Sequence, residues 1–252
     1  MLEIRKLSKV YANGVQALKA IELTITPGEF VVLVGLSGSG KSTLLRSINR
    51  LIEPTSGEVL FYGRNVTQAD PAELRAIRRE IGMIFQQFNL IPRASVLTNV
   101  LCGNLGYQPA SSSLYNSFPA EARQRALENL ARVGLLDKAY LRADSLSGGQ
   151  QQRAGIARAM MQRPRLMLAD EPVASLDPAT SHSVMEHLER VNRSEGLTVV
   201  CSLHYLGLAR RYGTRVVALK QGEIVFDGAP AAIDDERFAR IYGEGAFEVE
   251  SR

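Results

Sequence analysis

One stretch of the chain carries the residue types that bind phosphate. The pattern G-x-x-x-x-G-K-[ST] is matched in full by Gly35-Leu36-Ser37-Gly38-Ser39-Gly40-Lys41-Ser42. Glycines let successive backbone N–H groups point inward as an anion nest, and the positive end of a following helix adds to it. We expect Lys41 to reach the β- and γ-phosphates of a nucleotide and the Ser42 hydroxyl to bind Mg²⁺. The alternative is a glycine-rich turn without a ligand.

Two acidic residues end a short apolar run later in the chain. The run is Leu166–Ala169, and Asp170 and Glu171 follow it. In a parallel sheet the carboxyl ends of the strands face the ligand crevice. Asp170 is therefore predicted to hold Mg²⁺, directly or through water, and Glu171 to polarise the water that attacks the γ-phosphate. An exposed Asp-Glu turn is the alternative, which a nearby phosphate-binding loop disfavours.

A second candidate anion site begins a helical pattern. Leu146-Ser147-Gly148-Gly149-Gln150 precedes apolar residues at helical spacing, and free N–H groups at a helix start favour negative charge. One nucleotide does not need two distant nests, so the second makes sense if it meets a nucleotide held by another copy of the chain. With this signature between the phosphate loop and the acidic strand, the sequence resembles the ATP-binding cassette (ABC) ATPases of ABC transporters.

The resemblance implies roles for further residues. Tyr11 matches the aromatic residue that stacks on adenine, although a lone tyrosine is more often part of a core. Gln86 matches the glutamine that senses Mg²⁺ and the attacking water. His204 matches the switch histidine that contacts the γ-phosphate, and Asp177 matches a loop that crosses the dimer interface.

The implied site comprises three overlapping sets of residues. The catalytic set is Lys41, Gln86, Glu171 and His204. The set that contacts ATP is Tyr11, Gly35, Leu36, Ser37, Gly38, Ser39, Gly40, Lys41, Ser42, Thr43, Ser147, Gly148, Gly149, Gln150 and Asp177. The set that holds Mg²⁺ is Ser42, Gln86 and Asp170.

The resemblance also implies an assembly. The family's working unit is a head-to-tail pair of cassettes with two ATP molecules between them, so a second copy of this chain is the first expected partner. The longest apolar runs, such as Phe30–Val34, are far shorter than the ~20 residues of a membrane helix. Separate membrane permease subunits are therefore expected, with a solute-binding protein acting through them. We expect the chain to sit peripherally on the cytoplasmic face of a bacterial inner membrane.

Three runs resemble the ATP-binding subunits of phosphonate importers in particular: Leu33–Leu51, Ile81–Arg93 and Ala169–Pro178. This implies an ATPase that energises uptake of phosphonates or of a related oxyanion such as phosphite. Tyr205 departs from the glutamine that often follows the switch histidine, and the insert at 106–118 looks variable. Another small solute, such as a polar amino acid, therefore stays open as cargo.

ABC-type ATPases of DNA repair and of translation are alternatives outside transport. A repair ATPase would need a long coiled coil between the phosphate loop and the signature. The stretch from Ser42 to Leu146 is too short for one and has no sustained heptads. A translation factor usually carries two cassettes in one chain, whereas this chain has one.

These motifs need a scaffold that brings strand ends together. Short apolar runs, typical of strands buried on both faces, alternate with helical patterns. The runs are Phe30–Val34, Leu166–Ala169, Thr198–Cys201 and Val216–Leu219. Apolar residues alternate with polar ones at Leu2–Ile4 and Ile21–Ile25, which predicts antiparallel strands. We expect an α/β fold, with the parallel sheet of a P-loop NTPase (RecA-like) core, an antiparallel β subdomain and an inserted α-helical subdomain.

We expect one ABC ATPase domain over residues 1–252. The nucleotide-binding core with its β subdomain is predicted at about 1–88 and 162–252, and the helical subdomain with the signature at about 89–161. The polar stretch Gln108–Ser113 predicts a loop within it. A helix is predicted to begin at Asp177-Pro178, a capping residue followed by proline. The tail after Gly222 has room for a strand pair and a short helix.

Composition bounds the partners. The chain has 252 residues, 45% of them hydrophobic and 22% charged, with a net charge of +4. Its basic residues are scattered and it lacks tryptophan, so nucleic acid is not an expected partner. Cys102 and Cys201 are too few for a disulfide framework and are expected to be buried thiols. His182 and His187 fit no metal spacing and are expected to pack on a helix.

Overall fold

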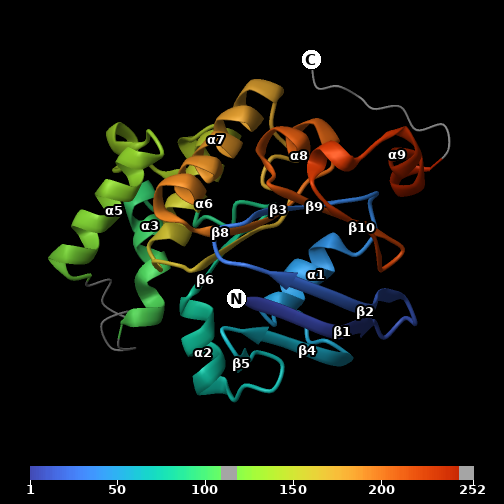
Figure 1. Ribbon diagram of the computed structural model, residues 1–252. Helices are drawn as coiled ribbons and strands as arrows, with labels where there is room; N and C mark the ends of the chain where they lie inside the picture. Colours follow the sequence, from blue (N-terminus) through green and yellow to red (C-terminus); the bar gives the residue numbers. More distant parts are fainter. Residues whose placement is uncertain (109–117, 244–252) are drawn as a thin grey trace.

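The computed structural model describes residues 1–108 and 118–243 (Figure 1). Within those residues one sheet has six strands in the order β10-β9-β3-β8-β7-β6. They are β3 (Phe30–Val34), β6 (Ile81–Ile84), β7 (Leu166–Ala169), β8 (Thr198–Ser202), β9 (Arg215–Lys220) and β10 (Glu223–Gly228). The strands from β9 to β6 are mutually parallel and β10 is antiparallel to β9. The predicted parallel core is confirmed.

A second sheet is antiparallel, in the order β2-β1-β4-β5. Its strands are β1 (Leu2–Val10), β2 (Gln16–Ile25), β4 (Ser56–Phe61) and β5 (Arg64–Asn65). Alternate residues of β1 and β2 are buried, because only one face of this sheet meets the core. The predicted antiparallel β part of the fold is confirmed.

Helices surround the parallel sheet. The α-helices are α1 (Lys41–Ile48), α2 (Pro71–Arg79), α3 (Val96–Leu101), α5 (Ala120–Arg132), α6 (Gly148–Met160), α7 (Pro178–Glu195), α8 (Leu206–Tyr212) and α9 (Asp235–Tyr242). Short 3₁₀-helices are η1 (Cys102–Tyr107), η2 (Leu136–Lys138), η3 (Ala143–Ser145) and η4 (Pro230–Ala232). None of the helices in the described residues is both long and apolar enough to cross a membrane.

The central strand β3 divides the core into two layers. Val31 and Leu33 belong to a cluster with α1 and the antiparallel sheet. Phe30, Val32 and Val34 face the opposite cluster, which includes residues of α3, α5, α6, α7, α8 and α9, whereas Ile77 of α2 lies in the first cluster. Because neighbouring residues of a strand point to opposite faces, an all-apolar strand is what a sheet covered on both sides requires.

The stretch predicted as a helical subdomain, 89–161, contains α3, α5 and α6, which lie together at one side of the molecule in Figure 1. The β pairing found there within the described residues is a single bridge, Ser95–Arg142. Most of the predicted loop Gln108–Ser113 and of the insert at 106–118 lies outside the described residues. Within the described residues, the tail after Gly222 holds β10, which pairs with β9, and α9.

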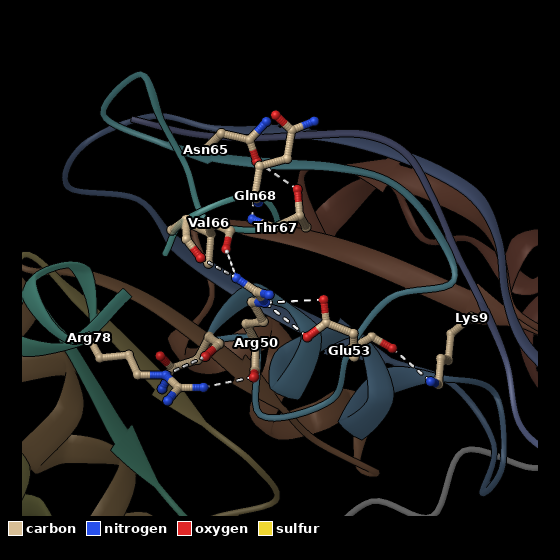
Figure 2. Close-up of polar contacts among 10 residues, drawn as sticks. Lys9, Arg50, Glu53, Asn65, Val66, Thr67, Gln68 and Arg78 are labelled. Carbon is tan, nitrogen blue, oxygen red and sulfur yellow. Dashed lines mark hydrogen bonds and ion pairs between the residues drawn. The ribbon is translucent and has the colours of Figure 1, made fainter. Parts of the chain in front are cut away.

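Two arginines fix the turn that follows α1 (Figure 2). Arg50 has φ 49, and its guanidinium bonds both carboxylate oxygens of Glu53, at 2.9 and 3.1 Å, and the Ala69 carbonyl at 2.7 Å. Arg78 of α2 donates to the carbonyls of Asn49 and Arg50, at 3.0 and 2.7 Å. These bonds satisfy carbonyls at the end of α1 and hold that helix against the segment before α2.

Candidate functional site

The phosphate-loop motif forms the turn between β3 and α1. Gly35 has φ 139, and a Cβ there would lie 2.2 Å from the carbonyl oxygen of Leu219. Gly40 has φ 110, and a Cβ there would lie 2.6 Å from the carbonyl oxygen of Ala17. No side chain caps the start of α1 within the described residues. The first-turn amides of α1 are therefore available to an anion.

Lys41 is buried and points back along the loop. Its Nζ donates to the carbonyls of Gly35 and Leu36, at 2.7 and 3.2 Å. Burial lowers the pKa of Lys41, and the charges of Glu171 and Asp170 oppose this shift. The lysine therefore lies within electrostatic reach of both acids that follow β7, as the sequence predicts.

Asp170 is fully buried at the end of β7. Arg46 of α1 donates to its Oδ2 from Nε at 3.0 Å and from Nη2 at 2.9 Å. The hydroxyl of Ser202, from β8, donates to its Oδ1 at 3.2 Å. Both carboxylate oxygens are thus bound by groups from neighbouring elements, and Arg46 balances the buried charge.

Glu171 is held at its backbone and at its carboxylate. Its φ of 48 lies in the left-handed region, and its N–H donates to Ser202 Oγ at 2.9 Å. Its Oε1 lies 2.7 Å from Nε2 of His204, which follows β8. The strand order places β7 beside β8, so these two predicted catalytic residues meet at the carboxyl edge of the sheet.

Gln86 follows β6 at the same edge and is exposed. It lines a hollow of about 490 Å³ together with Arg46, Gln87 and Asn89. Arg46 therefore connects this hollow to Asp170. The role of Gln86 in sensing Mg²⁺ stays a prediction.

Tyr11 lies beside the start of α1. Its hydroxyl is 3.2 Å from Oγ1 of Thr43, and the ammonium of Lys9 lies 5.3 Å from the centre of its ring. The residue is 36% exposed, so it is not the core tyrosine that the alternative interpretation required. An exposed ring at this place can stack on a base whose phosphates occupy the loop.

The second nest begins α6, among the helices of 89–161. Ser147 accepts a hydrogen bond from the Gln150 N–H at 3.4 Å, and the Gln150 side chain accepts one from the Ser147 N–H at 3.1 Å. A Cβ on Gly149 would lie 2.0 Å from Cγ2 of Thr180, so packing against α7 requires this glycine. In the described part of the chain, no hydrogen bond or ion pair joins Ser147 or Gln150 to the phosphate loop.

Asp177 caps α7, as its sequence context predicts. It accepts a hydrogen bond from the Thr180 N–H at 3.0 Å, and hydrogen bonds from the side chain and the N–H of Thr180 lower the pKa of Asp177. Its carboxylate is exposed beside the start of α6, where Thr180 packs on Gly149. Asp177 therefore caps the helix while its side chain stays exposed, and its position at a dimer interface stays a prediction.

The metal-binding residues predicted from sequence fit Mg²⁺ by donor type. Ser42, Gln86 and Asp170 offer hydroxyl, amide and carboxylate oxygens, which magnesium prefers. No cluster of three or more His, Cys, Asp or Glu side chains in the described residues could hold a metal alone. A cation here would therefore also need phosphate and water oxygens.

The sequence analysis gave no role to Arg46 or Ser202. Arg46 lies five residues after Lys41 on α1, and Ser202 is a polar residue at the end of an apolar strand. A polar residue ending a buried strand was the available signal for Ser202. His182 and His187 lie on α7, where Nδ1 of His182 is 2.9 Å from the Tyr212 hydroxyl. Cys201 is buried as expected, whereas Cys102 is partly exposed.

Known proteins share both sequence and fold with the chain. The family described as ABC transporter matches residues 18–174. The chain is 59% identical over 250 residues to the phosphonates import ATP-binding protein PhnC of Bdellovibrio bacteriovorus, covering 99% of this chain and 96% of that protein. It is 54% identical to the protein of the same name from Shouchella clausii, covering 99% and 94%.

Solved structures give the same result. The dimeric structure of MJ0796, a bacterial ABC transporter cassette, aligns with a TM-score of 0.82 and 40% identity, covering 92% of this chain and 100% of that one. A dimeric post-hydrolysis state of the same cassette, bound to ADP and Pi, aligns with a TM-score of 0.81 and 40% identity over the same shares.

Proposed function

The chain belongs to the ABC transporter family as an ATP-binding cassette, and from this premise we propose that it powers the import of phosphonates through separate permease subunits. The cassette binds ATP, and its hydrolysis of ATP to ADP and phosphate is coupled to transport. Support for the cargo comes from relatives named phosphonates import ATP-binding protein that are 52–59% identical over nearly the whole chain. The experiment below separates phosphonate from phosphite, which shares its charge.

The observation that carries the catalytic part is the convergence of Lys41, Asp170, Glu171 and His204 at one edge of the parallel sheet. The loop amides and the Lys41 ammonium would bind the β- and γ-phosphates. Glu171 would accept a hydrogen bond from the attacking water and orient it toward the γ-phosphorus. His204, which pairs with Glu171, would then contact the γ-phosphate. The oxygen of water bonds to the γ-phosphorus as the bond to ADP breaks, so that ATP and water give ADP and inorganic phosphate.

The oxygens of Ser42, Gln86 and Asp170 would hold Mg²⁺ beside the phosphates. The ion would supply charge neutralisation across the β- and γ-phosphate oxygens. Arg46 already donates twice to Asp170, at 2.9 and 3.0 Å, so it keeps that carboxylate in place. Asp170 would therefore bind the ion without a large rearrangement of β7.

A second copy of the chain would complete each site. Cassettes of this family work as dimers, and related solved cassettes are dimeric. In a head-to-tail pair, Ser147, Gly148 and Gly149 of one copy would meet the γ-phosphate held by the phosphate loop of the other. The open N–H groups at the start of α6 would then stabilise the transferring phosphoryl group in trans.

Permease subunits would dock at the hollow beside Gln86. This hollow is about 490 Å³, and exposed Leu51 and partly buried Ile52 contribute apolar surface to it. Because Gln86 lines this hollow and would also bind Mg²⁺, docking of a permease would affect the nucleotide site. The chain would then lie peripherally on the cytoplasmic face of the bacterial inner membrane, with a solute-binding protein delivering cargo from the other side.

Reconstitution with the permease and the solute-binding protein tests this proposal. ATPase activity would be measured with a phosphonate, phosphite, phosphate and a polar amino acid as separate additions. We expect the phosphonate to stimulate hydrolysis most strongly. Stimulation by phosphite alone, or by the amino acid, would contradict the cargo assignment but not the ATPase assignment.

A further inference from the structure

Ser202 lies where the two acids that follow β7 meet. The register pairs Ala169 with Cys201, and this brings Ser202, the next residue of β8, beside Asp170. Ser202 is 0% exposed. Its hydroxyl donates to Oδ1 of Asp170 at 3.2 Å and accepts the N–H of Glu171 at 2.9 Å. One buried hydroxyl therefore connects the side chain of one acid to the backbone of the other.

The direction of these two bonds follows from the partners. A backbone N–H only donates hydrogen bonds, so the Ser202 oxygen is the acceptor in its bond with Glu171. The single hydroxyl proton of Ser202 must point to Asp170, which already accepts two bonds from Arg46. A lone pair of the same oxygen is then aimed at the Glu171 N–H. The rotamer and the proton of Ser202 are fixed together.

Glu171 needs this support because its backbone is strained. Its φ of 48 lies in the left-handed region, which is unfavourable for a residue with a Cβ. The residues that follow β8 hold the side chain of Glu171, since Nε2 of His204 lies 2.7 Å from its carboxylate. Leu203, between the two, donates its N–H to the Leu33 carbonyl at 2.9 Å. Residues 202–204 are thereby fixed to β3, the strand that leads into the phosphate loop.

We propose that Ser202 is a positioning residue for ATP hydrolysis. Its hydroxyl fixes the backbone conformation of Glu171 and thereby the direction of the Glu171 carboxylate. The same hydroxyl fixes the position of Glu171 relative to Asp170. The inference rests on the proposed role of Glu171 in orienting water. Since a misplacement of about 1 Å can cost about 10²-fold in rate, loss of the hydroxyl lowers kcat and leaves ATP binding largely unchanged.

Two variants whose new side chains have nearly the same shape test the role of the Ser202 hydroxyl. Ser202→Thr keeps the hydroxyl, whereas Ser202→Val has nearly the volume of threonine and lacks it. Steady-state ATPase kinetics of each would separate kcat from KM. We expect Ser202→Val to lose at least about tenfold in kcat with KM for ATP within about threefold of wild type, and Ser202→Thr to keep most of kcat. If Ser202→Val does not fold, Ser202→Ala removes the hydroxyl without adding atoms and carries the same expectation.

Matched controls keep the outcomes distinct. Ser47 is also 0% exposed, and its hydroxyl has no hydrogen-bond partner within the described residues, so Ser47→Ala is expected to keep kcat. Equal losses in the Thr and Val variants, or a loss that appears in KM, would overturn the inference. Wild-type kcat in the variants without the hydroxyl would also overturn it. Glu171→Gln, measured in parallel, tests the underlying assignment: if that variant stays active, the proposed role of Glu171 fails first.

Discussion

Ionisable side chains in the candidate site lie within contact of one another. Glu171 meets His204 at 2.7 Å, and Asp170 meets Arg46 at 2.9 Å. Lys41 is held by two carbonyls of its own loop, and burial lowers the pKa of Lys41. Each side chain that the proposed chemistry needs therefore already has a polar partner in the chain, so that phosphate and Mg²⁺ would exchange with existing bonds.

Glu171→Gln tests the role of the proposed base. Glutamine keeps the size of the side chain but cannot take up negative charge, so ATP should bind while turnover falls by about 10²-fold or more. Single-turnover and steady-state ATPase assays would measure this. Glu186→Gln, an exposed change on α7, serves as the control and should leave turnover unchanged. Near-normal activity of Glu171→Gln would refute the assignment.

The environment of His187 is expected to make the stability of the fold sensitive to acid. Burial lowers the pKa of His187 below its ordinary value of 6.5, and the charges of Arg190 and Arg153 add to the shift. The unfolded chain then binds more protons than the folded chain below that value, so stability is present above it and is lost as the pH falls. His187→Gln removes this titration.

The melting temperature of both proteins, followed from about pH 7 to pH 5, would check the expectation. The wild-type curve should fall more steeply than the variant curve. Parallel curves would show that His187 does not contribute.

At the scale of elements, the phosphate loop depends on close backbone contacts with its neighbours. A Cβ on Gly35 would lie 2.2 Å from the Leu219 carbonyl oxygen of β9, whereas a Cβ on Gly38 would meet nothing within 4 Å. Both glycines have positive φ, of 139 and 78. Gly35 is therefore required both by the lack of space and by its backbone conformation, whereas Gly38 is required by its backbone conformation alone.

Gly35→Ala and Gly38→Ala separate these two requirements. Gly38→Ala should cost about 1–2 kcal/mol, the strain of an L-residue in the left-handed region. Gly35→Ala should cost more and weaken ATP binding, because β9 or the loop must move. Thermal unfolding and titration with a fluorescent ATP analogue would measure both. Equal losses in the two variants would contradict the packing argument.

Elements with strong local signals were predictable from the sequence. The apolar run Phe30–Val34 and the Asp177-Pro178 start of α7 match the structure residue for residue. β6 was missed because it has four residues, one of them Gly82, and shows no alternation. α2 was missed although Asp70-Pro71 carries the same capping signal, with Asp70 accepting two backbone hydrogen bonds.

The site was predictable where its residues form motifs. The contacts of Arg46 and Ser202 were not, because each depends on which strands are neighbours. Arg46 meets Asp170 across 124 positions of sequence and Ser202 meets it across 32. Strand order and register, which local patterns do not encode, decide both contacts.

At the scale of the whole molecule, the two anion nests belong to different parts of the chain. One lies between β3 and α1, and the other begins α6 among the helices at one side of Figure 1. Gly149 cannot be used to test the second nest, because a Cβ there would lie 2.0 Å from Thr180 and disturb packing. Ser147 is exposed and can be changed without that clash.

The mass of Glu171→Gln in solution with Mg²⁺ and ATP, measured by light scattering, tests the central claim most directly. The same measurement is made on the double variant Glu171→Gln, Ser147→Glu. The second substitution places a negative charge at the start of α6. Glu171→Gln carrying Ser194→Glu is the matched control, because Ser194 lies near the end of α7, whereas the start of α7 packs on Gly149. We predict twice the monomer mass for Glu171→Gln and for the control, and the monomer mass when Ser147→Glu is present. A monomer in all three, or a dimer that Ser147→Glu leaves intact, would contradict the account.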